Sequence, residues 1–355
     1  MHRSLVICLG LAVGSCAILL VRSRATLTSA PHILAQEKLD HAKVQDDPHQ
    51  LVALLKSSDI ERRRKAAESL QQVGRGAVPA LITALDDQDG CQRRRAACVL
   101  GAIGAAAKDA IPKLVQLLAD SHVQSHAMQA LAKIGRDATP ALAVALGHPD
   151  ASVREAAAQT LGMLGTEAKE AIPRLSLALQ DDESMVRIQA AYAIWRVQQQ
   201  SNEPVPVLSV LTLGLKDHDR GTRKESAKLL GYICSWRAKG SHEAIPVLIA
   251  SLNDEDPVVR STVVAALSYS DSAEQSLLEA LTSSDALVRG GAAEALGLSY
   301  SKTALTTLKD RLQDDDTGVR AAAQRAITRI NEGRPFICGT GAMGLGADWT
   351  YHCME

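Results

Sequence analysis

One order of polar and apolar residues recurs nine times between residues 49 and 331. Each copy holds an acidic residue, an arginine position four residues later, then small apolar residues, and a leucine or isoleucine seven residues after the arginine position. In one copy these residues are Asp150, Arg154, Ala157 and Leu161. Apolar residues at spacings of three, four and seven fall on one side of an α-helix. The pattern therefore predicts one helix per copy, with a buried stripe of alanine and leucine.

The acid and the arginine position of each copy have predictable roles. The arginine position recurs at intervals of 29 to 37 residues, at Arg63, Arg93, Gln124, Arg154, Arg187, Arg223, Arg260, Arg289 and Arg320. The acids before it are Asp59, Asp89, Asp120, Asp150, Glu183, Asp219, Asp256, Asp285 and Asp316. An acid directly before a helix accepts hydrogen bonds from the free backbone N–H groups of the first turn. We expect each acid to be an N-cap, and each arginine to reach a carboxylate in its own or the adjacent turn, which would form a ladder.

A second helical pattern precedes each acid. In six copies a proline opens it, at Pro79, Pro112, Pro140, Pro173, Pro206 and Pro246. Proline is tolerated in a first helical turn because its missing N–H has no partner there. Small residues such as Ala157 and Gly162 let neighbouring helices approach closely. Each copy is thus a helical hairpin that cannot bury its apolar side alone, so the sequence predicts an all-α fold, an α-solenoid of about nine stacked hairpins over residues 49–331.

These copies resemble HEAT repeats of the short class, whose consensus is xIPxLxxALxDxDxxVRxxAAxALGxIG. Residues 172–197 follow this consensus almost throughout, and the resemblance covers roughly residues 49–331. Short repeats of this kind occur in phycobilin lyase subunits. The resemblance implies a superhelix in which the second helices of the hairpins line a concave surface.

Charge and composition narrow the classes of function. The formal net charge is −1, which gives no support for a nucleic-acid partner held through its phosphates. The basic runs at residues 62–65 and 93–95 are local and are typical of a solvated helix face. No nucleic-acid partner is therefore expected.

Two motifs in the sequence are candidates for a cofactor site or a metal site. Residues 339–344 spell GxGxxG, but a dinucleotide site needs a strand before this motif and a helix after it. His122 and His126 share a helix face and His148 follows in the next copy, yet the segment lacks the glutamate of an HExxH zinc motif. We expect no cofactor and no metal.

Two enzymes built from HEAT repeats offer alternatives. Deoxyhypusine hydroxylase binds its iron pair through several His-Glu dipeptides, whereas this chain has one, His242-Glu243. No residue set that carries phycobilin lyase activity can be identified here. We interpret the chain as a non-catalytic scaffold for protein interactions. A HEAT-type phycobilin lyase, or a lyase-like chaperone subunit, is the alternative, and a deoxyhypusine-hydroxylase-like activity is a further one.

The N-terminal residues 1–24 form a separate segment, with an apolar run from Leu5 to Val21 followed by Arg22 and Arg24. This composition is typical of a targeting segment, although 17 residues is at the short end for a spanning helix. An uncleaved membrane anchor, a cleaved signal peptide, a lipoprotein acylated at Cys16 and a wrongly assigned start all remain open. We expect an exported protein, periplasmic or membrane-anchored through this segment, with residues 25–48 as a linker.

The C-terminal residues 332–355 form a glycine-rich tail without helical periodicity. Cys338 and Cys353 bracket it. In an oxidising compartment these two cysteines could form a disulfide, and unpaired thiols are the alternative.

The aromatic residues point to a partner site. None occurs before residue 192, and then Tyr192, Trp195, Tyr232, Trp236, Tyr269 and Tyr300 follow in successive copies. Aromatic and arginine side chains anchor protein interfaces. The predicted groove, which would hold another protein or peptide, consists of Ile188, Tyr192, Trp195, Arg196, Lys224, Lys228, Tyr232, Trp236 and Tyr269, with Ile188 and the three cations at exposed positions. The alternative is that the aromatic rings only fill packing gaps where the copies are longer.

Overall fold

The computed structural model describes residues 47–198, 207–235 and 241–333. The chain divides into two units, Met1–Gln45 and Asp46–Glu355, and every described residue belongs to the second. The predicted N-terminal segment, nearly all of the predicted linker and the tail from residue 334 onwards lie outside the described residues. The same holds for Pro206 and Trp236.

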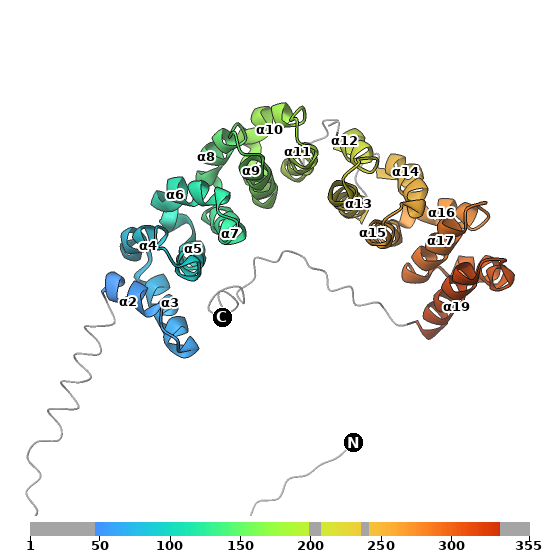
Figure 1. Cartoon of the computed structure of the whole chain (residues 1–355), viewed down its shortest axis with the longest axis horizontal. Helices are drawn as coiled ribbons and strands as arrows, with labels where there is room; N and C mark the ends of the chain where they lie inside the picture. The colour runs from blue at the N-terminus through green and yellow to red at the C-terminus, as the bar shows by residue number, and fades with distance from the viewer. Residues whose placement is uncertain (1–46, 199–206, 236–240, 334–355) are drawn as a thin grey trace, which may run out of the picture. The chain divides into compact units, whose positions relative to one another are not determined.

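Helical hairpins follow one another along the described residues (Figure 1). Their first helices are α2 (Pro48–Leu54), α4 (Val78–Ala84), α6 (Ile111–Gln116), α8 (Thr139–Ala145), α10 (Ile172–Ala178), α12 (Val207–Gly214), α14 (Ile245–Ala250), α16 (Glu274–Ala280) and α18 (Leu305–Asp310). Their second helices are α3 (Ile60–Val73), α5 (Gly90–Ile103), α7 (Gln124–Ile134), α9 (Ala151–Leu164), α11 (Ser184–Val197), α13 (Arg220–Ser235), α15 (Pro257–Ser268), α17 (Ala286–Leu298) and α19 (Thr317–Glu332). The described residues thus form nine hairpins without a strand, which confirms the predicted all-α solenoid.

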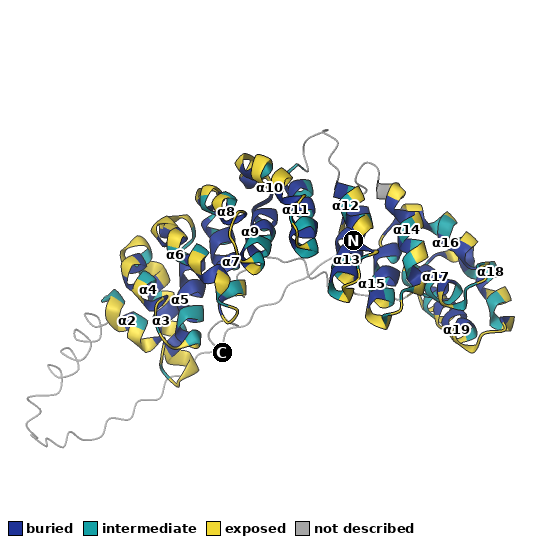
Figure 2. Ribbon diagram, turned by 45° about the horizontal axis from the view of Figure 1, so that its top comes forward, coloured by how far each residue is buried: buried dark blue, intermediate teal, exposed yellow. Residues whose placement is uncertain are grey.

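The hairpins stack so that their helices form two layers, the first-helix layer and the second-helix layer. Each second helix packs against the next one along the chain, most extensively in the pairs α9–α11, α13–α15 and α17–α19. Figure 2 shows the buried residues on the sides where helices meet and the exposed residues on the outer sides. The core is therefore distributed along the stack, with fully buried leucines such as Leu70, Leu100, Leu131 and Leu161 at the predicted position in successive second helices.

Most of the predicted N-caps are present. Seven of the nine acids accept a backbone N–H of the first helical turn: Asp59, Asp89, Asp150, Asp219, Asp256, Asp285 and Asp316. Glu183 occupies the N-cap position of α11 but makes no side-chain hydrogen bond there. Asp120 accepts the backbone N–H of His122 at 3.0 Å in the same way, but it is not the N-cap of α7. A turn in which Val123 and Gln124 donate to its carbonyl comes first, and α7 begins only at Gln124.

The arginine ladder is also present, and it has two parts. Each arginine of the repeat donates through Nη1 to carbonyls in the turn before its own helix; Arg154, for example, lies 2.9 Å from the oxygen of His148 and 3.0 Å from that of Pro149. Four arginines add a bridge to an aspartate of the next hairpin: Arg93–Asp120, Arg154–Asp181, Arg223–Asp254 and Arg289–Asp314. These bridges are forked, with Nε and Nη2 of Arg154 at 2.7 and 2.8 Å from the two carboxylate oxygens of Asp181. They join hairpins two to three, four to five, six to seven and eight to nine.

Close approach between second helices explains the small residues of the repeat. A Cβ atom added to Gly162 would lie 3.3 Å from the Cα atom of Ala193 in the next second helix. At Gly297 the corresponding distance to the Cα atom of Ala326 is 2.7 Å. A side chain at Gly297 would therefore push α17 and α19 apart, which accounts for glycine in a helix despite its low helix propensity.

The N-cap hydrogen bonds yield a first test. Asp219 accepts hydrogen bonds from both the backbone N–H and the hydroxyl of Thr222, so Asp219→Ala should lower the free energy of unfolding by about 1 kcal/mol. Glu183→Ala is the matched control, because Glu183 holds the same position without a cap bond and should change stability by less than about 0.5 kcal/mol. Urea unfolding followed by circular dichroism measures both. Equal losses in the two variants would contradict this account of the caps.

The bridges between hairpins yield a second test. In a double-mutant cycle with Arg154→Ala and Asp181→Ala, we expect a coupling of about 1.5 to 3 kcal/mol, as for hydrogen bonds between charged groups that are largely removed from water. The control is Arg260→Ala. Arg260 also donates to two carbonyls of its own turn. In the next hairpin, however, Ser283 stands where an aspartate would have to accept the bridge.

The same bridge has a pH dependence. The hydrogen bond from Arg154 lowers the pKa of Asp181 below its usual value of 3.8. A carboxylate with a lowered pKa in the folded state stabilises the fold above its usual pKa, and this contribution is lost as the pH falls through the lowered value. The stability difference between the wild type and Asp181→Asn should therefore be constant near neutral pH and shrink below about pH 4. A difference that persists in strong acid would show that the charge of Asp181 is not involved.

Candidate functional site

Three of the predicted aromatic residues form one cluster across two second helices. Tyr192 and Trp195, three positions apart on α11, have ring centroids 5.6 Å apart. Tyr232 on the neighbouring helix α13 has its ring centroid 6.5 Å from that of Tyr192. These distances are within the range in which aromatic rings attract each other. Residues 40 positions apart in sequence thus form one continuous aromatic surface because α11 and α13 are adjacent in the stack.

The aromatic cluster is buried on one side and exposed on the other. Tyr192 and Trp195 are partly buried and pack against the hydrophobic core, and burial raises the pKa of the Tyr192 hydroxyl. Tyr232 remains 40% exposed, and Tyr269, the C-cap of α15, remains 43% exposed. The first pair therefore supports the stack, and Tyr232 and Tyr269 present ring surface to the solvent.

The charged residues beside the cluster differ in the hydrogen bonds and ion pairs that they form. Arg196 hydrogen-bonds Tyr192 and thereby opposes the effect of burial on that tyrosine's pKa. Lys228 pairs with Glu225 at 2.6 Å. Lys224 is exposed, and among the described residues it forms no ion pair. Of the predicted cations, Lys224 is thus the one whose charge faces the solvent uncompensated.

A buried polar group next to the cluster was not predicted from the sequence. Gln189 on α11 donates to Glu225 on α13 at 3.2 Å. Burial raises the pKa of Glu155 on α9, and the charge of Glu225 raises it further. The sequence could have indicated this pair. Gln189 stands three positions before Tyr192, and Glu225 stands three positions before Lys228, so each shares a helix face with a predicted site residue.

The structure corrects one predicted site residue. Ile188 was expected at an exposed position, but it is 1% exposed. A Cβ atom added to Gly214 would lie 2.9 Å from its Cδ1 atom, so Ile188 faces the first helix of the next hairpin, α12. Trp236 lies outside the described residues. Tyr300 lies in the turn after α17 with φ 56°, away from the helix on which it was expected.

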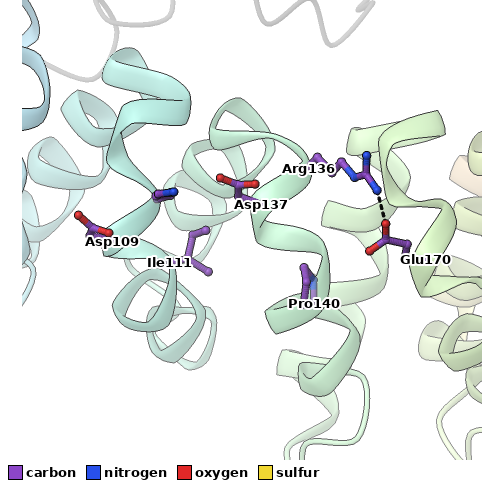
Figure 3. A pocket seen from close by; sticks show the side chains of 7 residues that line it. Asp109, Ile111, Arg136, Asp137, Pro140 and Glu170 are labelled. Carbon is purple, nitrogen blue, oxygen red and sulfur yellow. Dashed lines mark hydrogen bonds and ion pairs between the residues drawn. The ribbon is translucent and has the colours of Figure 1, made fainter.

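An open cavity lies elsewhere, among the 3₁₀ turns that precede hairpins three, four and five (Figure 3). Its volume is about 430 Å³, and its lining includes Asp109, Arg136, Asp137, Pro140 and Glu170. Arg136 forms an ion pair with Glu170 at its edge, as the dashed line in Figure 3 shows. Arg75 approaches Asp109 to 3.7 Å from the preceding turn. The charges that line this cavity are therefore paired or widely exposed.

His126 is one of the histidines that the sequence offers as candidate metal ligands. Burial lowers the pKa of His126, and the charge of Arg94 lowers it further. Within the described residues, no group of three His, Cys, Asp or Glu side chains could hold a metal ion. No helix in that part of the chain is both long and apolar enough to cross a membrane.

A stack of helical hairpins in two layers places this protein in the class of α-solenoids. Models of HEAT repeats match residues 48–132, 111–195, 172–268 and 245–328. These matches cover most of the chain, and the chain therefore belongs to the HEAT-repeat family. No curated protein matches it.

Solved structures support the fold. A structure of Kap95p with RanGDP matches with a TM-score of 0.56 and 14% identity, over 86% of this chain and 48% of that one. A structure of importin beta gives 0.53 and 16%, over 86% and 49%. The chain thus spans about half the length of these solenoids. The complex of CpcE and CpcF of phycocyanin lyase from Nostoc sp. PCC7120 also matches, with 29% identity over 64% of this chain and 91% of that one. Its TM-score is 0.39.

Proposed function

We propose that the chain is a non-catalytic scaffold that binds a protein or peptide on its second-helix layer, at the aromatic surface of α11, α13 and α15. The observation that carries the proposal is the exposed ring surface of Tyr232 and Tyr269 beside the half-buried pair of Tyr192 and Trp195. Aromatic anchors of this kind dominate the binding energy of many protein interfaces.

The distribution of aromatic residues supports this proposal. The described hairpins before α11 contain no aromatic residue, yet they stack in the same way. Packing of the repeat therefore does not require aromatic side chains. A ring that is two-fifths exposed also gains only part of the burial energy available to it, roughly 25 cal/mol for each Å² of apolar surface. A bound partner that covers Tyr232 and Tyr269 would supply the remainder.

The cations favour a partner with acidic or carbonyl oxygens near its apolar anchor. Lys224 offers an uncompensated charge one helical turn before Lys228, on the same face of α13. Glu225 is already occupied, because it accepts from Gln189 and Lys228. The charge of Lys224 therefore remains available to an acidic or carbonyl oxygen of a partner.

Partner binding can be separated from folding with two kinds of variant. Tyr232→Ser with Tyr269→Ser should weaken a captured partner at least fivefold, the effect of losing about 1 kcal/mol at an interface anchor, with little change in melting temperature. Tyr192→Ala should mainly destabilise the fold, by roughly 3 kcal/mol for a truncated aromatic residue that supports the core. Partners are identified by cross-linking and mass spectrometry, and their affinity is then measured by fluorescence anisotropy.

The control for this experiment is Leu287→Ser, which removes an exposed leucine from the first turn of α17. It should leave the affinity unchanged. Unaltered affinity in the double tyrosine variant, at normal stability, would refute the aromatic surface as the binding site.

We further propose that residues 1–24 direct export and tether the chain to a membrane. The support is compositional: the apolar run from Leu5 to Val21 is followed by two arginines. Alkaline phosphatase fused to the C-terminus, which is active only after export, should be active on the full chain and inactive when residues 2–24 are deleted. Equal activity in the two fusions would exclude this role for the segment.

A further inference from the structure

The first-helix layer carries an apolar stripe that the proposed function does not use. Three large aliphatic side chains are strongly exposed there: Val144 on α8 is 72% exposed, Leu177 on α10 is 69% exposed and Leu213 on α12 is 70% exposed. Each stands two positions after a fully buried leucine of its helix, namely Leu142, Leu175 and Leu211. They therefore occupy the same position in three consecutive hairpins and form one row across the layer.

The fold does not require aliphatic residues at this position. In the other hairpins the same position holds Ala53, Thr83, Gln116, Ala250, Glu279 and Asp310, all of which are exposed. These residues are small or polar, as expected for a solvated site. The three aliphatic residues together thus form an exposed apolar patch of the kind that marks an interaction site, and we call it the outer stripe.

A cleft lined by both apolar and polar residues adjoins one end of the outer stripe. A cavity of about 390 Å³ lies between α10, α11 and α12, and its lining includes Leu179, Ile188, Val210 and Leu213. Its polar lining comes from Gln180, Ser184, Arg187, Ser209 and Asp217. A side chain of a partner that packs on Leu213 could therefore extend into a space between two hairpins.

The three helices that carry the outer stripe hold few charges, although Arg187 and Asp217 line the cleft beside Leu213. Helices α8 and α12 contain no charged residue, and α10 contains only Arg174. Arg174 is exposed and stands three positions before Leu177, so the two share a helix face. No ion pair joins Arg174 to another described residue. A ligand of the stripe would thus meet apolar side chains and a single free cation at its centre.

We propose that the outer stripe binds an amphipathic α-helix of a partner protein, with aliphatic residues every seven positions and a carboxylate that pairs with Arg174. Seven residues of an α-helix rise about 10.5 Å, and packed helices lie about 8 to 10 Å apart. A partner helix that crosses α8, α10 and α12 can therefore place one aliphatic side chain on each of the three exposed residues. The free guanidinium of Arg174 fixes the sign of the charge that the partner presents.

A second copy of this chain fits the stripe less well. A stable dimer interface buries about 1,200 to 2,000 Å², whereas the stripe consists of three side chains. Two identical stripes would also bring two Arg174 side chains toward each other, because pairing about Leu177 places equivalent residues near the two-fold axis. Charge complementarity thus favours an acidic partner helix.

The test uses synthetic peptides and the full chain. The probe is a fluorescein-labelled helical peptide of three heptads, rich in alanine and glutamine, with leucine at every seventh position and a glutamate one turn from the central leucine. Its register control has the same composition with the leucines at irregular spacing. Anisotropy titrations should show binding of the first peptide and at least tenfold weaker binding of the second.

Variants of the chain then identify the surface. Leu177→Ser should weaken the peptide at least tenfold, whereas Leu54→Ser, which removes an exposed leucine of α2, should have no effect. Arg174→Glu should weaken the glutamate peptide about fivefold and should bind a lysine version of the peptide better than the wild type does. Circular dichroism and melting curves verify that each variant is folded.

Several outcomes would overturn the proposal. These are the absence of peptide binding, equal binding of the two registers, or binding that survives Leu177→Ser. Sedimentation velocity covers the alternative of a second copy: a concentration-dependent dimer that Leu177→Ser abolishes would assign the stripe to self-association. Because Tyr232→Ser and Tyr269→Ser lie in the other layer, they should leave peptide binding intact, so this test and that of the aromatic surface fail independently.

Discussion

Every hairpin of this chain depends on its neighbours to cover the apolar sides of its helices. Alanine and leucine line the sides where second helices meet, and at Gly297 glycine leaves no room for a side chain against Ala326. Since the contacts link each hairpin to the next, stability is close to a sum of local terms along the stack. The exposed ends of the helices add a polar contribution, because the arginines of the repeat bond the turn of their own hairpin and four of them also bond an aspartate of the next.

This construction leaves the outer sides of both layers free to vary. A substitution between helices disturbs two hairpins at once, whereas a substitution on an outer side changes only what the solvent or a partner meets. The aromatic rings on α11 and α13 and the aliphatic residues on α8, α10 and α12 are departures of this second kind. Function in a solenoid is therefore to be sought at positions where one run of hairpins differs from the others in residues that stacking does not constrain.

The repeat made the fold predictable, because nine copies of one spacing specify the same hairpin and the same N-cap chemistry. The errors arose where local geometry departs from the common repeat. Asp120 does not cap α7 because an extra turn delays the helix, and Ile188 is buried because hairpin six approaches α11 from the side. The arginine bridges depend only in part on the residue in the next turn: Asp181 accepts from Arg154 and Ser283 offers Arg260 no carboxylate, but Asp217 stands at the equivalent place for Arg187 without a bridge. Such differences lie in turns that a helical pattern does not describe. The pairing of Tyr192 with Tyr232 required only that neighbouring second helices be adjacent, so that part of the candidate site followed from the repeat itself.

The two surfaces differ in the kind of energy they can supply. Tyr192 and Trp195 already contribute to folding, so the aromatic surface is held rigid by the core before any partner arrives, and binding there orders few side chains. The outer stripe has no such support: Val144, Leu177 and Leu213 extend from the helices into solvent and gain burial only in a complex. Both surfaces include hairpins five and six, where Gln189 and Glu225 form a side-chain hydrogen bond between α11 and α13. A partner on either layer would contact helices of both hairpins and so stabilise the same junction. A ligand that binds only the folded stack stabilises it by mass action, so either partner would raise the free energy of unfolding of this junction.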